Sequence, residues 1–284
     1  MSQPDVEFDR LRREFGYDAR SYSVRNDAVF WVQDPRPLEV SAFSDAIQDE
    51  IARAVESSWW YRVRNEIIVK KLKKRGFSGT LWDVGSGTGV VTAALVEAGI
   101  PAIAIEPSPG GTAIATQRGV VSVQGTLQSL NLPDSCLAGV GAFDVLEHVT
   151  NRHDFLQEIV RVLVPGGHFI VTVPALQLLW SHADIEARHY LRYSRRTLRN
   201  ELERCGLEVL SLGYFFALIV PPLLLIRALP YRLGLRVSDT NNSALRASGG
   251  ILGKLARRIE VAWAGRVPFG SSLLVVAQKP SQSN

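Results

Sequence analysis

Leu81-Trp-Asp-Val-Gly-Ser-Gly-Thr-Gly-Val90 is the stretch of sequence that decides the fold. An apolar, β-branched run ends at Val84, three glycines alternate after it, and a helical pattern then runs from Val90 to Ala98. Glycines at such a junction allow a tight turn and let backbone N–H groups approach a ligand. The stretch therefore predicts a strand, a binding turn and a helix, which together begin a doubly wound α/β fold.

A lone acidic residue, Glu106, ends the next apolar run, 21 residues after Gly85. In a βαβ unit this is about where a carboxylate binds the hydroxyls of a ribose. The dinucleotide fingerprint is G-x-G-x-x-G, but the order here is G-x-G-x-G, and Val90 takes the place of the third glycine. A nucleoside-containing ligand is expected, and an NAD-dependent oxidoreductase is the alternative that this spacing disfavours.

With Asp83 included, the turn reads D-x-G-x-G-x-G, which resembles motif I of the class I methyltransferases that depend on S-adenosylmethionine (SAM). Asp144-Val-Leu-Glu-His148 is similar to their D-V-L-E-H element, and Leu163 to Pro174 is similar to their L-x-P-G-G turn and fifth strand. Trp59 to Arg64 and Leu179 to Tyr193 resemble elements of a bacterial small-molecule subgroup. The resemblance covers roughly residues 59 to 280.

Strands and helices alternate along the chain, which predicts a mainly parallel sheet with helices on both faces. We expect seven strands, at 80–84, 102–105, 120–123, 140–146, 168–173, 207–212 and 273–277. The resemblance implies a Rossmann-like methyltransferase fold whose last strand runs antiparallel. The expected organisation is an N-terminal helical extension (1–75), a SAM-binding core (76–213), a hydrophobic and basic cap insertion (214–267), and the last core strand with a tail (268–284).

The resemblance also implies a set of cofactor-binding residues, with SAM as the cofactor. The glycine turn would line the methionine moiety, Glu106 would take the ribose hydroxyls, and the segment after the third strand would lie near adenine. Thr126 stands where the family commonly has an acid, so the adenine contact there departs from the family pattern. The full set is Asp83, Gly85, Ser86, Gly87, Gly89, Glu106, Pro107, Thr126, Leu127 and Asp144.

Methyl transfer is an in-line displacement, so alignment supplies much of the acceleration and no nucleophilic residue is required. An oxygen or nitrogen acceptor can still need deprotonation, a task that suits histidine. His189 and His148 are the candidate catalytic residues, and a structural hydrogen bond is the alternative role of each. The candidate substrate contacts, for which packing or bridging is the alternative, are Trp59, Trp60, Tyr61, Trp180, Arg188, Arg192 and Tyr193.

Asp144, Glu147 and His148 resemble the spacing of divalent-cation ligands in some quinone-biosynthetic O-methyltransferases. The same D-V-L-E-H element occurs in relatives thought to be metal-free, and the sequence analysis therefore expects no metal centre. The chain has only two cysteines, and its first nine residues lack a basic stretch and an apolar core. These features predict a cytoplasmic protein without a disulfide framework or a signal peptide.

Residues 214–226 are apolar but are broken by Pro221 and Pro222, so the run is too short to span a bilayer. A buried cap over the substrate, a peripheral membrane contact and a dimer contact all remain open. Residues 227–266 carry a formal charge of +6, which suits a solvated face, an anionic acceptor or an acidic membrane. Nucleic acid is not expected, because aromatic residues are not interleaved with the basic ones.

The sequence thus predicts a methyltransferase that converts SAM to S-adenosylhomocysteine and methylates O or N of a small-molecule acceptor, which can be anionic or lipid-like. The alternative from another class is a SAM-binding, non-catalytic regulatory or partner subunit.

Overall fold

The structure is a computed structural model that describes residues 9–10, 13–14, 22–25, 29–32, 58–235 and 250–281. A helical stretch was also expected over 46–74, and its first part (46–57) lies outside the described residues, as does a turn expected at 34–37.

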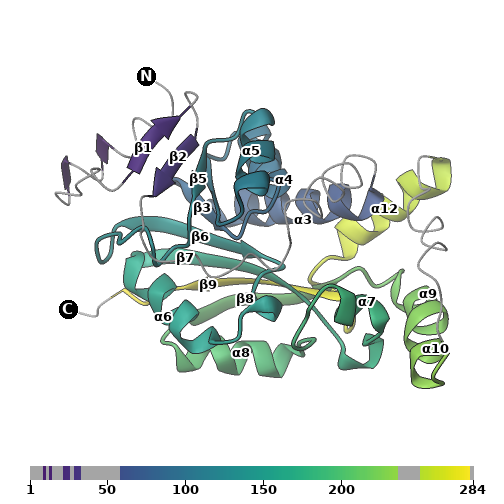
Figure 1. Cartoon of the computed structure of the whole chain (residues 1–284). Helices are drawn as coiled ribbons and strands as arrows, with labels where there is room; N and C mark the ends of the chain where they lie inside the picture. Colours follow the sequence, from purple (N-terminus) through teal and green to yellow (C-terminus); the bar gives the residue numbers. More distant parts are fainter. Residues whose placement is uncertain are drawn as a thin grey trace.

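One mixed sheet forms the centre of the molecule, in the order β1-β2-β5-β4-β3-β6-β7-β9-β8 (Figure 1). From β2 through β5, β4, β3 and β6 to β7 the neighbouring strands are parallel, while β9 runs antiparallel to both β7 and β8. The predicted fold class is confirmed, including the reversed last strand. The strands are β1 (Tyr22–Arg25), β2 (Val29–Val32), β3 (Leu81–Val84), β4 (Ala102–Glu106), β5 (Ser122–Gln124), β6 (Leu137–Phe143), β7 (Leu163–Pro174), β8 (Glu208–Phe215) and β9 (Ser272–Gln278).

Two details of the sheet differ from the prediction. An antiparallel β1–β2 pair extends the sheet beyond β5, although no strands were expected there. The sixth strand of the sheet in chain order, β6, ends at Phe143 because Asp144 takes a left-handed conformation (φ +59) and a 3-10 turn, η2 (Leu146–His148), follows. Because the strands from β2 to β7 are parallel, their carboxyl ends lie at one edge of the sheet, which is where ligands bind in folds of this kind.

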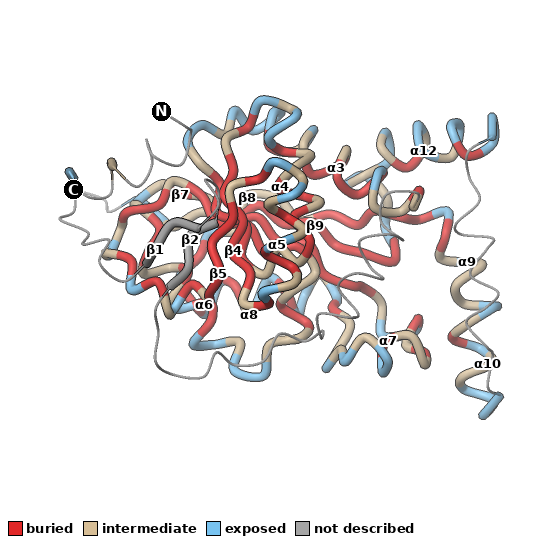
Figure 2. Tube along the Cα trace, turned by 45° about the horizontal axis from the view of Figure 1, so that its top comes forward, coloured by how far each residue is buried: buried red, intermediate tan, exposed pale blue. Residues whose placement is uncertain are grey.

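Helices cover both faces of the sheet (Figure 1), and apolar side chains on both sides make the sheet the buried centre of the molecule (Figure 2). One face packs against α3 (Trp59–Arg75), α4 (Val90–Glu97) and α12 (Ile251–Trp263), and α5 (Pro109–Gln117) packs beside α4. The other face packs against α6 (Arg152–Val162) and α8 (Arg195–Arg204).

Local sequence signals explain where these helices begin and end. Ser194 caps α8 in a capping box with Thr197, and the Asn151 side chain accepts the Asp154 N–H at the start of α6. Gly76 ends α3 in the left-handed conformation (φ +65) that favours glycine. α6 ends at Val162, and β7 begins at once, so the Pro165-Gly-Gly turn lies inside the strand instead of stopping the helix.

The inserted segment after β8 is helical. α9 (Val220–Leu223), a π-helical turn called η4 (Leu224–Ala228) and α10 (Leu229–Arg232) follow one another, and α12 comes later. Phe215, the last residue of β8, and Phe216 and Ile219 after it pack into the core beneath α3, so the first residues of the predicted cap (214–267) lie in the core. Among the described residues, every helix is too short or too polar to cross a membrane.

Candidate functional site

The glycine turn after β3 is held in place by the carboxylate of Glu106. Gly85, Gly87 and Gly89 all have positive φ, between +55 and +71, which L side chains rarely adopt. Glu106, at the end of β4, is buried and accepts the Gly87 N–H at 2.8 Å and the Ser108 N–H at 2.9 Å. The predicted ribose carboxylate and the predicted methionine turn therefore lie in direct contact.

Close packing explains why glycine is needed on both sides of this turn. A Cβ on Gly85 would lie 2.8 Å from Val145, and one on Gly89 would lie 2.6 Å from the Ala115 Cβ of α5. Gly111 packs against the Gly87 carbonyl in the same way, with 2.9 Å to its ideal Cβ position. The start of α5 therefore fits tightly against the turn.

Asp83 lies at the base of the turn and is only 1% exposed. Its carboxylate accepts the Thr92 hydroxyl at 2.6 Å, which ties β3 to α4. Burial raises the pKa of Asp83 to about 7, against the lowering effect of the Thr92 hydrogen bond. The predicted methionine contact thus also joins two elements of the core.

Several buried polar atoms at the carboxyl edge of the sheet have no hydrogen-bond partner among the described residues. They include Ser86 Oγ after β3, Gln124 Oε1 at the end of β5 and Glu147 Oε2 after β6. Buried polar groups are nearly always paired, so orphaned ones at a ligand edge indicate missing ligand contacts. A nucleoside with an amino acid chain presents hydroxyls, an ammonium and a carboxylate, and these residues fit such a ligand.

The predicted adenine segment follows β5. Thr126 and Ser129 exchange hydrogen bonds that close a turn. In one of them, the Thr126 hydroxyl accepts the Ser129 N–H at 3.1 Å. Leu127 is fully buried, and Pro107 is half-buried beside Glu106. The contact of this segment with adenine stays a prediction.

Arg64 of α3 connects the N-terminal aromatic residues to the sheet edge. Its guanidinium is buried, forms an ion pair with Asp144, and lies 4.8 Å above the ring of Trp60 and 4.9 Å above that of Tyr61. Thr172 of β7 donates to the other Asp144 oxygen at 3.2 Å. The W-W-Y-R element is thereby placed next to the D-V-L-E-H element.

Trp59, in contrast, joins two helices. Its indole N–H donates to the Gly253 carbonyl of α12 at 3.0 Å, and its ring packs on Phe216 at 5.8 Å. This is the packing alternative of the sequence analysis, and it leaves Trp60 and Tyr61 as the aromatic residues beside Asp144.

His189 is held by a buried carboxylate that the sequence analysis did not assign. Its Nδ1 lies 2.9 Å from Asp184 of α7 (His182–Glu186), whose side chain is fully buried. Although burial raises the pKa of Asp184, its hydrogen bonds with His189 and Arg192 outweigh that effect and hold the pKa below its usual value. Arg192 donates to the same oxygen at 2.7 Å and to the Ala175 carbonyl at 3.1 Å.

These contacts give Arg192 the bridging role that was the alternative to binding an acidic acceptor. The Tyr190 N–H donates to the Glu147 carbonyl at 2.9 Å, and so the segment from His189 to Tyr193 lies across the end of β6. Of the other predicted substrate contacts, Arg188 is exposed, Trp180 is half-buried and Tyr193 is fully buried.

His148 and His189 form an edge-to-face pair, with ring centroids 4.9 Å apart. Burial, followed by the effect of His189, lowers the pKa of His148 to about 4, so that this imidazole is neutral at pH 7. Burial and the nearby Asp144 raise the pKa of the Glu147 carboxyl well above its usual range.

Glu147, His148 and His189 each have one potential metal-ligand atom in a common group. These three atoms lie within 4.8 Å of one another, close enough to share a metal ion. The group differs from the one that the sequence resembled, because Asp144 forms an ion pair with Arg64 and is absent from the group.

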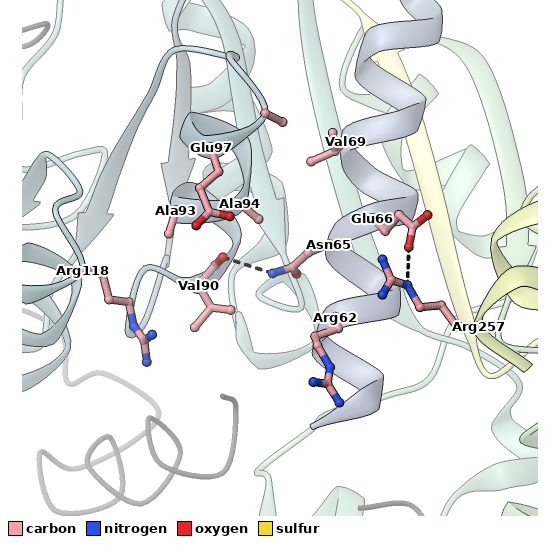
Figure 3. A pocket seen from close by; sticks show the side chains of 11 residues that line it. Arg62, Asn65, Glu66, Val69, Val90, Ala93, Ala94, Glu97, Arg118 and Arg257 are labelled. Atoms are coloured by element: carbon pink, nitrogen blue, oxygen red, sulfur yellow. Dashed lines mark hydrogen bonds and ion pairs between the residues drawn. The ribbon is translucent and has the colours of Figure 1, made fainter. Parts of the chain in front are cut away.

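A groove of about 460 Å³ lies between α3 and α4. Figure 3 shows side chains of both helices along it, with Arg257 paired to Glu66 and the Asn65 amide donating to the Val90 carbonyl. Its described lining residues include none of the predicted site residues, and they mix basic and acidic side chains. The groove is therefore separate from the site at the sheet edge.

Residues 82–171 match the family model described as a methyltransferase domain. The chain is 28% identical over 187 residues to a Mycolicibacterium smegmatis protein named "Probable S-adenosylmethionine-dependent methyltransferase", a match covering 64% of this chain and 72% of that protein. It is 30% identical over 125 residues to an uncharacterized methyltransferase of Mycobacterium avium, covering 42% of this chain and 49% of the relative. The match thus spans about half the length of that second relative.

A solved structure of a SAM-dependent methyltransferase from Thermotoga maritima aligns with a TM-score of 0.54 at 18% identity. The alignment covers 83% of this chain and 97% of that chain, which shows that the two share a fold. On these findings, residues 82–171 are similar to a methyltransferase domain, the chain has the Rossmann-like fold of its structural neighbours, and its motifs and relatives support SAM as the cofactor.

Proposed function

We propose that this chain transfers the methyl group of SAM to an oxygen or nitrogen of a small-molecule or lipid-like acceptor, with His189 as the general base. The observation that carries the proposal is the pair of the buried Asp184 carboxylate and the half-buried His189 (2.9 Å), which lies over the end of β6 at the edge that also holds the glycine turn and Glu106.

SAM, when bound, supplies an electrophilic methyl group on a sulfonium. The glycine turn and Glu106 would hold its amino acid and ribose parts, and Asp144 with Arg64 would border the methyl donor. Ser86, Gln124 and Glu147 would form hydrogen bonds with SAM through side-chain atoms that have no partner among the described residues. Because in-line displacement depends on alignment, rigid binding by these residues is a main part of the proposed catalysis.

The acceptor side is built from α7 and the segment after it. Asp184 holds the Nδ1 of His189, which leaves Nε2 to take a proton from the acceptor as its bond to the methyl group forms. The Asp184 charge would stabilise the imidazolium that results, as in other carboxylate–histidine pairs. Asp184 is therefore a positioning residue, and His148, whose pKa is lowered to about 4 by burial and by His189, is the weaker base.

The test is the rate of S-adenosylhomocysteine formation with phenolic, carboxylic, amine and lipid-linked hydroxyl acceptors. For an accepted substrate we expect His189→Asn to lower kcat by about 100-fold or more, with little change in SAM affinity. His182→Asn is the matched control, since His182 lies on the same short helix as Asp184 but makes an edge-to-face contact with Tyr231 (ring centroids 4.8 Å apart). Its kcat should stay within about threefold of wild type.

Asp184→Asn should lower kcat more than it raises KM, because it removes the charge that orients His189. An unchanged kcat/KM for His189→Asn would contradict the assignment of the base. If no acceptor gave product although SAM binds, the non-catalytic subunit would become the better account.

A further inference from the structure

We propose that one end of the molecule docks onto an anionic lipid bilayer through exposed apolar residues of the α9–α10 helix and the first turns of α12. This docking face consists of Leu225, Ile226, Leu229, Leu233, Ile251, Leu252 and Leu255. Docking requires no methyl transfer, so the inference stands apart from the proposed function.

The α9–α10 helix exposes the kind of side chain that surface helices normally bury. Leu225, Leu229 and Leu233 follow one another at intervals of four and are 63%, 44% and 65% exposed. Residues four apart lie on one side of a helix, so these leucines form a continuous apolar stripe. Ala228, between Leu225 and Leu229 in the sequence, is fully buried, so this helix buries a small residue while its large apolar ones are exposed to the solvent.

The first turns of α12 also expose large apolar side chains. Ile251, Leu252 and Leu255 in its first turns are 86%, 82% and 52% exposed. The views of Figures 1 and 2 place the beginning of α12 at the same end of the molecule as α9 and α10. Several large exposed apolar residues grouped at one end of a molecule indicate an interaction site, because scattered single residues are the normal case.

Basic residues accompany the apolar ones. Arg232, Lys254 and Arg258 are exposed on the same helices, and the stretch 227–266 has a formal charge of +6. Apolar side chains with a basic border are typical of helices that lie in the interface of an anionic membrane. A second copy of the chain fits less well, since a symmetric contact would bring each basic cluster against itself.

The docking face is connected to the acceptor side of the proposed site. The Tyr231 ring makes an edge-to-face contact with His182 of α7 (ring centroids 4.8 Å apart), and Arg232 donates to the Leu178 carbonyl at 3.1 Å. α7 also carries Asp184, which holds His189. A bilayer bound at this face would therefore lie next to the elements that build the acceptor side.

The experiment is co-sedimentation of the full chain with vesicles of phosphatidylcholine, alone or mixed with phosphatidylglycerol, at low and high salt. We expect binding to the mixed vesicles at low salt and a marked loss at high salt or without the anionic lipid. Leu229→Gln/Leu233→Gln should weaken the binding by about tenfold or more. Lys254→Gln/Arg258→Gln should weaken it by about thirtyfold, or about fivefold for each charge removed.

Val96→Gln is the matched control, because Val96 is an exposed apolar residue (37%) of α4, outside the docking face. It should bind vesicles like the wild type, and all variants should keep the thermal midpoint and SAM affinity of the wild type. Failure of the wild type to bind anionic vesicles would overturn the proposal, as would full binding by both double variants. A dimer in light scattering that Leu229→Gln/Leu233→Gln dissociates would assign the face to a second copy instead.

Discussion

Asp83 shows how a single residue can serve a binding turn at a cost to folding. Its carboxylate is 1% exposed, and burial raises its pKa to about 7, above the ordinary value of 3.8. The folded chain therefore retains a proton between these two values that the unfolded chain has lost. The free energy of unfolding should fall as the pH rises across this range, because the unfolded state then binds fewer protons.

Asp83→Asn is predicted to remove this pH dependence. Asparagine keeps an oxygen that can accept the Thr92 hydroxyl but carries no charge. Relative to the wild type, the SAM-free variant should therefore gain about 1–3 kcal/mol of stability between pH 5 and pH 8. Denaturant unfolding at several pH values measures the difference. A stability difference that stays constant across this range would show that Asp83 ionises normally.

At this scale the sequence could predict residues that belong to local motifs. The three glycines form the turn itself, Glu106 follows Gly87 by 19 residues at a spacing typical of the motif, and the structure brings them together. Asp184 and Arg64 were not assigned to the site. Asp184 lies in a segment without a strong sequence pattern, and the partner of Arg64 is distant along the chain. Arg64 meets Asp144 80 residues further on, a contact that only the fold creates. A basic residue in the W-W-Y-R element was the available signal for it.

Elements in this chain depend on glycine where two backbones approach closely. Gly89 has φ +71, and its ideal Cβ position is 2.6 Å from the Ala115 Cβ of α5 and 3.0 Å from the Ala115 Cα. Gly99, after α4, has φ +78 but nothing within 4 Å of its ideal Cβ. Both glycines have a positive φ, but only Gly89 lacks space for a Cβ. Comparing substitutions at the two positions therefore separates the effect of backbone conformation from that of a steric clash.

Gly89→Ala should destabilise the chain by about 2–4 kcal/mol and weaken SAM binding, because α5 must move away from the turn. Gly99→Ala should cost about 1 kcal/mol, the strain of a left-handed alanine, and leave SAM binding unchanged. Thermal unfolding and SAM titration of both variants test this. Equal losses of stability would mean that backbone conformation alone requires glycine at position 89.

Element types were easier to predict from the sequence than element ends. The strands and helices of the core were expected because their apolar periodicity is strong, as in α6 with its buried Phe155, Leu156 and Ile159. The β7 start at Leu163 was missed, since a register shift near Gly139 lets the Pro-Gly-Gly turn remain within the strand. The π-helical turn at Leu224–Ala228 has no sequence signal of comparable strength.

At the scale of the whole molecule, the sheet order could be inferred only through the resemblance to a family. Hydrophobic patterns do not specify which strands pair, because non-local pairing depends on connections such as right-handed crossovers. The β1–β2 pair was unexpected for the same reason. The division of the chain into an extension, a core and an inserted cap stays a prediction, although the apolar start of the insertion lies in the core.

The whole-molecule account also explains why the site lies where it does. Parallel strands bring Glu106, Gln124 and Glu147 to one edge, and helices from both faces supply Arg64 and the neighbours of the glycine turn. Binding at this edge should stabilise the fold, by about 2.7 kcal/mol at a ligand concentration one hundred times Kd.

The most direct test of the central claim is a calorimetric titration of the chain with SAM, S-adenosylhomocysteine and NAD, repeated with Glu106→Gln. The account predicts binding of SAM and its product at one site per chain, no binding of NAD, and SAM affinity at least about tenfold lower in the variant. Similar unfolding midpoints would show that the variant keeps its fold. The account would be contradicted if the chain bound NAD but not SAM, or if Glu106→Gln bound SAM as tightly as the wild type.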